Sequence, residues 1–296
     1  MNFKVKKIIN PLLLVLAAII WGFAFVAQKS GADSIEPFTL NAARSFVGGI
    51  FLLPVIYILK DKAPKPIEKG TKKDLIIGGV LCGTVLYAAT AFQQFGLTEG
   101  TDAGKAGFIT ALYIVLVPVF SIFLKKKTGF KTWFSVALSV VGLYLLCVTG
   151  KLTIAPSDLT VLVCALIFTV HILVIDHFSP KVEGIKMSCI QFFVCGILSL
   201  ISLFIWGETL SINALLSAAF PILYLGIMSS GIAYTLQIIG QRDTDPTLAS
   251  ILMSLESVFA VLAGAIFGET LSGREALGCV VMFIAIIISQ LPTKRK

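Results

Sequence analysis

The sequence predicts an all-α membrane protein in which ten transmembrane helices form two inverted repeats of five helices. Three observations support this fold class: an apolar composition, ten apolar segments of spanning length, and a second half that repeats the first with a fixed shift. The chain has 296 residues, of which 57% are hydrophobic and 14% are charged. Soluble domains have roughly 45–50% apolar and 25% charged residues, so this composition favours a polytopic membrane protein.

The ten segments follow one another with short loops. A spanning helix needs about 20 apolar residues at 1.5 Å each to cross roughly 30 Å of hydrocarbon. The first segment follows Lys6 and Lys7 as a signal peptide would, but no small-x-small cleavage site follows it, so we expect an uncleaved helix. No room is left for a soluble domain. The expected spans are 11–29, 37–59, 75–96, 102–124, 131–149, 157–176, 185–206, 218–240, 246–267 and 273–291.

The two halves align when residues 17–21 are placed on residues 164–168. Without a gap, this shift pairs Arg44 with Gln191, Gly49 with Gly196, and Tyr87 with Tyr234. Each half has five segments, and five is odd, so the second half must enter the bilayer from the opposite side. We expect the repeats to cover 11–149 and 157–291. Inverted repeats of this kind build secondary transporters whose substrate site lies between the halves near the midplane.

The net charge of +8 describes the topology rather than a nucleic-acid partner, which we do not expect. With the N-terminus placed in the cytoplasm, 19 of the 24 Lys and Arg residues fall on the inner side and four on the outer side, while Arg44 lies within a segment. This bias predicts a multi-pass protein of the cytoplasmic membrane with both termini inside. The loop after 37–59 holds six Lys residues, whereas its repeat partner Gly207-Glu208-Thr209 holds none. Equivalent loops therefore lie on opposite sides of the bilayer.

Four segments carry a resemblance to a known family. Residues 96–120, GLTEGTDAGKAGFITALYIVLVPVF, resemble the fourth-helix signature of the drug/metabolite transporter superfamily, in its ten-helix EamA-type branch. Residues 19–31 and 37–49 are similar to its first and second helices, and residues 245–272 to its ninth. The resemblance implies a chamber between the halves that opens alternately to each side, usually for export of amino acids or related metabolites.

One departure from the family pattern lies in the ninth segment. Ser257 stands where the family usually has a proline after the glutamate, whereas the first half keeps Pro118. A proline within a helix removes a backbone hydrogen bond and kinks the helix. The sequence therefore does not by itself predict a kink in the ninth segment.

Arg44 is the first candidate for substrate binding. It lies seven residues into 37–59, about 10 Å below the outer boundary at 1.5 Å per residue. Charges at such depth cost at least about 2.5–3.5 kcal/mol on insertion scales and usually face the protein interior. Arg44 either clamps a carboxylate or phosphate or ties down carbonyls as a structural residue, since its repeat partner Gln191 is neutral. Lys105, about 6 Å inside 102–124, either adds its charge to this site or snorkels outward.

Two residues are candidates for proton coupling. Glu256 lies eleven residues into 246–267, about 16 Å deep and close to the midplane. Burial disfavours the charged form of a carboxylate, so Glu256 can take up a coupling proton or face a substrate ammonium group. The alternative is a glutamate satisfied by serine or backbone partners. His171, about 9 Å from the inner boundary, either relays protons or packs as a hydrogen-bonded residue.

Aromatic and amide side chains complete the expected chamber wall. Trp21 and Tyr113 lie near mid-depth, away from the interfacial belt where aromatic residues are common. Each of these side chains taken alone also suits a packing role. Besides the charged candidates, we expect the wall to include Trp21, Gln28, Gln94, Tyr113, Tyr234 and Gln237.

The sequence favours a transporter over other membrane proteins. It has no Walker A motif, GxSxG, HExxH or pair of intramembrane Asp residues, so neither P-loop ATP hydrolysis nor an enzyme is predicted. His171 and His177 have no further ligands nearby in sequence, so we predict no metal site, and we predict no cofactor. We expect a monomer or homodimer in the bilayer that moves a small-molecule metabolite, with proton coupling as an option. The alternatives are an exchanger of phosphorylated sugars or nucleotide-sugars, and a channel or non-transporting receptor.

Overall fold

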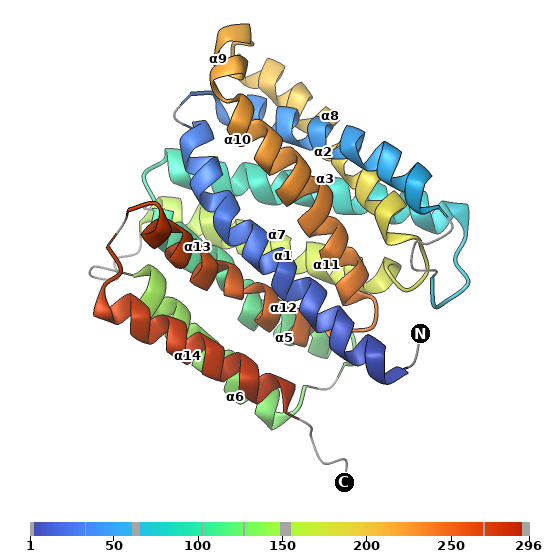
Figure 1. The fold of residues 1–296 in the computed structure, drawn as a ribbon, viewed down its shortest axis with the longest axis vertical. Helices are drawn as coiled ribbons and strands as arrows, with labels where there is room; N and C mark the ends of the chain where they lie inside the picture. The colour runs from blue at the N-terminus through green and yellow to red at the C-terminus, as the bar shows by residue number, and fades with distance from the viewer. Residues whose placement is uncertain are drawn as a thin grey trace.

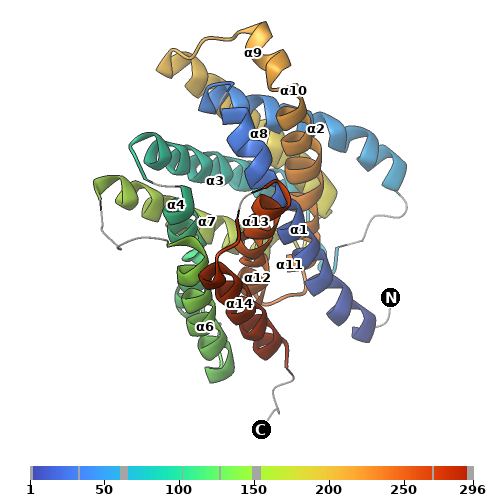
Figure 2. The same cartoon turned by 60° about the vertical axis from the view of Figure 1, so that its left-hand side comes forward.

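The computed structural model describes residues 3–32, 34–60, 66–101, 103–126, 128–148, 155–268 and 270–291, and all regular elements in these ranges are helical. Ten spans in this part of the chain are long and apolar enough to cross a membrane. They begin and end within a few residues of the ten expected segments. The all-α, ten-span prediction is therefore confirmed, and Figures 1 and 2 show the resulting bundle.

Seven of these spans are single α-helices and three are interrupted. The single helices are α1 (Phe3–Ala32), α2 (Pro37–Leu59), α3 (Lys72–Thr98), α6 (Phe130–Cys147), α7 (Pro156–Phe178), α8 (Gly184–Trp206) and α14 (Gly273–Gln290). The interrupted spans are α4 (Ala103–Ala111) with α5 (Tyr113–Phe123); α10 (Ala219–Leu223) with the π-helix η1 (Tyr224–Ala233) and α11 (Tyr234–Gln241); and α12 (Pro246–Met253) with α13 (Leu255–Ile266). A short helix, α9 (Ile212–Ser217), precedes α10.

Local sequence signals fix where the helices start. Pro37, Pro156 and Pro246 occupy the first turns of their helices, where the missing N–H of proline leaves no bond unmade. Ser272 and Glu275 form a reciprocal cap at the start of α14, which satisfies two otherwise unpaired backbone donors. These starts set the depth of each polar residue, including those of the site described below.

The two halves pack reciprocally through α2 and α8. A Cβ atom added at Gly49 would lie 3.2 Å from the ring of Phe193, and one added at Gly196 would lie 3.2 Å from the ring of Phe46. The 147-residue shift pairs Phe46 with Phe193 and Gly49 with Gly196, so each contact is the repeat image of the other. Reciprocal contacts of this kind are the signature of a two-fold axis. At the opposite edge of the bundle, α6 packs beside α14 (Figures 1 and 2).

The fourth and ninth spans are both interrupted, at Leu112 and at Ser254. The ninth span breaks without a proline. The hydroxyls of Ser250 and Ser254 donate to the carbonyls of Thr247 and Ile251, each at 2.8 Å. Serine hydroxyls that bond to nearby carbonyls compete with the helical pattern and bend helices, and this supplies the break that the absent proline would have made.

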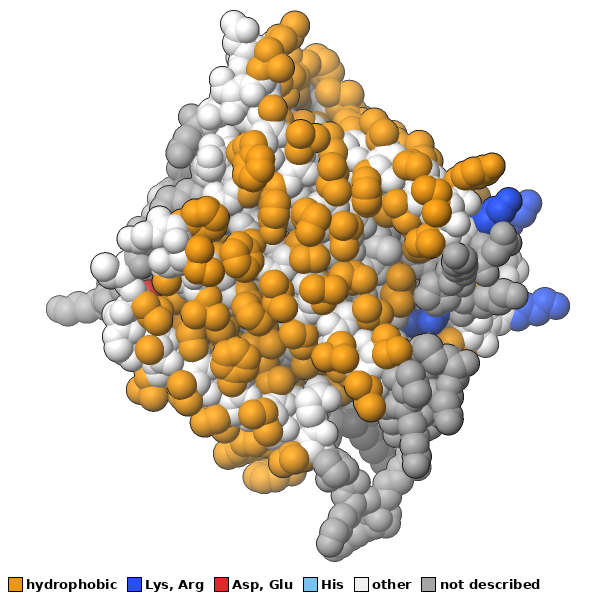
Figure 3. Space-filling view, in the orientation of Figure 1, with side chains coloured by type: hydrophobic (Ala, Val, Ile, Leu, Met, Phe, Trp, Pro, Cys, Tyr) orange, Lys and Arg blue, Asp and Glu red, His pale blue; other side chains and the backbone are white. Residues whose placement is uncertain are grey.

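The outer surface of the bundle suits a lipid bilayer. Figure 3 shows a face covered by apolar side chains, with Lys and Arg side chains at the end where α1 begins. Leu53, Ile201 and Phe204 are examples of large apolar residues that are about half exposed or more. Exposed apolar surface on this scale marks a protein that is solvated by lipid.

Candidate functional site

A cavity of about 100 Å³ lies between the two halves, where the interrupted spans meet. This is several times the roughly 10–15 Å³ that one water molecule needs. Its walls come from both repeats: α1, α2, α3, α4 and α5 from the first, and α7, η1, α11, α12 and α13 from the second. Interrupted helices at the interface of inverted repeats form the binding sites of many secondary transporters.

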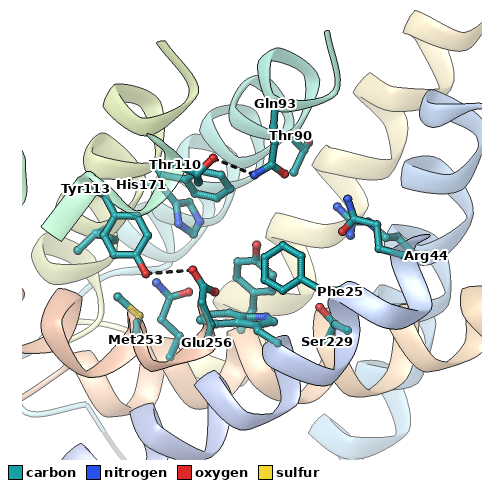
Figure 4. A pocket seen from close by; sticks show the side chains of 17 residues that line it. Phe25, Arg44, Thr90, Gln93, Thr110, Tyr113, His171, Ser229, Met253 and Glu256 are labelled. Carbon is teal, nitrogen blue, oxygen red and sulfur yellow. Dashed lines mark hydrogen bonds between the residues drawn. The ribbon is translucent and has the colours of Figure 1, made fainter. Parts of the chain in front are cut away.

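Tyr113 and Glu256 join the two repeats at one side of this cavity. The hydroxyl of Tyr113 donates to Oε1 of Glu256 at 3.1 Å (Figure 4). Each residue sits just after a helix break, Tyr113 as the first residue of α5 and Glu256 in the first turn of α13. The first turn of a helix favours a negative charge. Among the described residues, no cation lies within salt-bridge distance of Glu256, so its carboxylate is available to a proton or to a cationic group.

Arg44 approaches the cavity from the other side (Figure 4). Its Nε donates to Oδ1 of Asn41, one turn earlier on α2, at 2.9 Å. Its two terminal nitrogens have no hydrogen-bond or ion-pair partner in the described part of the chain. The guanidinium fork is thus held at its base while its tip remains available to a planar anion.

His171 lines the cavity and also forms a hydrogen bond with a buried side chain, Gln191. Its Nε2 lies 3.1 Å from Oε1 of Gln191, and both side chains are buried. Its ring also meets Tyr234 edge-on, with centroids 6.0 Å apart. Tyr234 further contacts Trp21, at 4.8 Å between centroids, and Phe192, at 5.4 Å. Trp21, His171 and Tyr234 therefore form one aromatic group in the wall of the cavity.

The structure brings together six of the eight residues proposed for the site. Gln94 is not among the lining residues; its neighbour Gln93 is, and its Nε2 donates to Oγ1 of Thr110 at 3.1 Å. The side chain of Lys105 lies outside the described residues. Gln28 and Gln237 also line the cavity. The six residues that meet there are Trp21, Arg44, Tyr113, His171, Tyr234 and Glu256.

Several lining residues were missed by sequence reasoning. Thr110 could have been predicted from the sequence, since it precedes Tyr113 by three residues and shares its side of the span. Ser229 could not have been predicted, because the π-helix η1 changes which residues of that span face inward. Small and apolar side chains give no signal of this kind. The missed residues are Ala24, Phe25, Thr90, Gln93, Thr110, Phe168, Ile172, Ser229 and Met253.

Comparison with known proteins gives a family. The model of the EamA-like transporter family matches residues 9–148 and 155–291. An uncharacterized transporter of Archaeoglobus fulgidus is 32% identical over 290 residues, covering 97% of this chain and 87% of that protein. The uncharacterized inner membrane transporter YedA of Escherichia coli is 26% identical over 278 residues, covering 92% and 88%. The uncharacterized transporter YoaV of Bacillus subtilis is 22% identical over 290 residues, covering 96% and 97%.

A solved structure supports the same fold. It is described as "Crystal structure of protein", and it matches with a TM-score of 0.79 and 19% identity over 95% of this chain and 96% of that chain. At this identity the likeness concerns the fold alone. Together with two family matches that cover both repeats, it identifies the ten-helix arrangement as a two-repeat transporter fold. The chain therefore belongs to the EamA-like transporter family of the drug/metabolite transporter superfamily and is a multi-pass membrane transporter.

Proposed function

We propose that the protein is a secondary transporter that exports small zwitterionic or carboxylated metabolites, such as amino acids, across the cytoplasmic membrane by alternating access. The observation that carries this proposal is the placement of Arg44 and Glu256 on opposite sides of one cavity. A zwitterion carries a carboxylate for the first and an ammonium group for the second. Arg44 is the one Lys or Arg among the described lining residues, which favours a single carboxylate over a phosphorylated sugar.

Proton coupling follows from the chemistry of Glu256. Its carboxylate can hold either a proton or the ammonium group of the substrate, but not both, because protonation removes the charge that attracts the ammonium. If each reorientation of the cavity carries one or the other, proton entry drives substrate exit. Tyr113 bridges the two repeats at this point through its hydrogen bond to the carboxylate.

The orientation in the membrane is part of the proposal. We infer that both termini face the cytoplasm, as the distribution of Lys and Arg indicates. The basic side chains at the end where α1 begins support this orientation. Single cysteines at positions 65 and 208 on a cysteine-free background test it. An impermeant thiol reagent added to intact cells should label position 208 and spare position 65, and the reverse pattern would refute the orientation.

The substrate is found by comparing the metabolites inside and outside cells that overproduce the protein, cells that overproduce Arg44→Gln, and cells that lack the gene. We expect one or a few carboxylated metabolites to accumulate outside only with the active protein. Purified protein in proteoliposomes should then move these compounds with saturable kinetics and respond to an imposed pH gradient. Flux that rises linearly with concentration and ignores the gradient would indicate a channel instead.

A further inference from the structure

We propose that Asn41 is a positioning residue for transport: it aims Arg44 into the cavity and, as a neutral acceptor, leaves the positive charge of Arg44 available to the substrate. This inference rests on the proposed function, in which Arg44 binds the anionic group of the substrate. Asn41 does not line the cavity itself. Its side chain is buried on α2, with 8% of its surface exposed.

The hydrogen bonds around Asn41 leave only one orientation for its amide. Arg44 Nε can only donate, so the atom facing it at 2.9 Å must be the carbonyl oxygen Oδ1. On the other side, Nδ2 lies 2.7 Å from Oγ of Ser199 and 3.3 Å from Oγ1 of Thr90. Each of these hydroxyls donates to a backbone carbonyl and therefore accepts from Asn41 in this arrangement. A flipped amide would set its NH2 group against the N–H of Arg44 Nε and would require both hydroxyls to give up their backbone carbonyls.

This chain of bonds anchors Arg44 to the other repeat. Ser199 is fully buried on α8, whereas Asn41 and Arg44 belong to α2. The two helices pack through the reciprocal Phe and Gly contacts described above, so the anchor sits in a tightly packed part of the bundle. The Arg44 side chain is long and otherwise free to rotate, and fixing its Nε holds the terminal nitrogens in one direction.

The repeat itself does not require this unit. Under the 147-residue shift, Asn41 falls on Ser188 and Arg44 on Gln191. Ser188 accepts a bond from Thr235 at 2.9 Å, while Gln191 is engaged by His171. Neither of these two contacts joins Ser188 to Gln191. The hydrogen-bonded pair of Asn41 and Arg44 is therefore a feature of the first repeat and is not repeated in the second.

The neutral character of Asn41 follows from the same geometry. An aspartate has nearly the same shape and would also accept from Arg44 Nε. The hydroxyls of Ser199 and Thr90 would turn from their backbone carbonyls to donate to its second oxygen, so the guanidinium would keep its direction. Its negative charge, however, would pair with Arg44 inside the protein, where such a pair interacts far more strongly than in water. The site would then be neutral overall, and its attraction for a carboxylate would be lost.

The test uses two variants. Asn41→Asp neutralises the positive charge of the site but keeps the direction of the Arg44 guanidinium. Ser199→Ala loosens the hold on that direction but keeps the charge. Ser188→Ala at the repeat-equivalent position is the matched control. Ligand binding is measured in detergent by thermal stabilisation, with L-amino acids and simple monocarboxylates as probes, each paired with its methyl ester. The ester keeps the shape of the acid but has no carboxylate charge.

We expect wild-type protein to prefer an acid over its ester by about tenfold or more, since a charge-assisted bond to Arg is lost in the ester. Asn41→Asp should abolish this preference by weakening the acid alone. Ser199→Ala should reduce it about two- to fivefold, in keeping with the net value of one buried hydrogen bond, and Ser188→Ala should leave it unchanged.

The outcomes separate the two claims. A wild-type protein that shows no acid preference with any probe pair would overturn the proposed function and the role of Arg44 with it. A wild-type preference that persists undiminished in Asn41→Asp would overturn the role of Asn41 alone. If Asn41→Asp does not fold, an unchanged preference in Ser199→Ala overturns that role instead.

Discussion

The surroundings of Arg44 and of its repeat partner Gln191 differ in a way that explains the site. Gln191 is fully buried and engaged by His171 at 3.1 Å. The residue equivalent to His171 in the first repeat is Ala24, which has no side chain that can reach Arg44 and which lines the cavity. One half thus buries its polar side chain against a second side chain, whereas the other leaves a charged group facing the cavity. The repeat supplies the scaffold, and the departures from it supply the chemistry.

A second pair of equivalent positions shows the same principle in packing. Gly22 on α1 lies directly against α13, where an added Cβ atom would come within 2.4 Å of Phe259 Cβ and 2.6 Å of its backbone carbon. Its repeat partner Thr169 is buried on α7, with its hydroxyl bonded to the carbonyl of Ala165 at 2.9 Å. The first helix of each repeat therefore approaches its neighbour at a different distance.

The largest expected effect comes from giving position 22 the threonine that stands at its repeat partner, Thr169. Gly22→Thr places a branched side chain against backbone atoms of α13 that have no room to move. Overpacking of this kind costs about 1–3 kcal/mol, and more where the backbone must shift. We expect little monodisperse protein by size-exclusion chromatography and a strongly lowered Tm. Gly107→Ala is the control, since nothing lies within 4 Å of its added Cβ. A Gly22→Thr protein as stable as wild type would refute the close approach.

The next effect concerns the negative charge of Glu256. Glu256→Gln keeps the shape and the bond from Tyr113 but has no proton to cycle. We expect gradient-driven transport in proteoliposomes to stop. Exchange between preloaded vesicles should persist with a raised apparent KM, because the amide has no charge to attract the ammonium group of the substrate. Tyr113→Phe, which keeps the carboxylate, should retain gradient-driven transport. Full pH-dependent transport by Glu256→Gln would remove this residue from the mechanism.

Substitutions at Arg44 should have a smaller effect, a graded rise in the apparent KM for substrate. Arg44→Lys keeps the charge but loses the two-pronged geometry, so the apparent KM for substrate should rise. Arg44→Gln, which reproduces Gln191, should raise KM further, by about tenfold or more, because the charge is also lost. Initial rates of uptake into proteoliposomes, at equal protein content, measure both. An unchanged KM in both variants would make Arg44 a structural residue.

The smallest effect should appear where the two repeats are truly alike. Gly49→Ala and Gly196→Ala each place a methyl group 3.2 Å from a phenylalanine ring that can shift slightly. We expect each to destabilise the protein by about 1 kcal/mol and, because the contacts are reciprocal, to lower Tm by the same amount. A marked difference between the two Tm values would show that the α2–α8 packing is less symmetric than the geometry indicates.

Much of the fold was predictable from the sequence because the signals are local. The length of each apolar run gives the ten spans, and the count of five per half gives the inversion. The depth of Arg44 and Glu256 follows from the helix starts, and a charge at depth points to the interior because lipid cannot solvate it. Six of the eight proposed site residues meet at one cavity for this reason.

The tertiary structure alone decided which neighbouring residues face that cavity. Gln93 and Gln94 are adjacent and chemically identical, and about 100° of helix rotation separates them, so only packing selects the first. The break at Ser254 depends on serine hydroxyls finding carbonyls within their own helix, and the inward position of Ser229 depends on the π-helix η1. Helix surfaces that face lipid and those that face other helices are both apolar. The sequence therefore determined which segments cross the membrane, but their rotation and pairing were fixed only by contacts between the two halves.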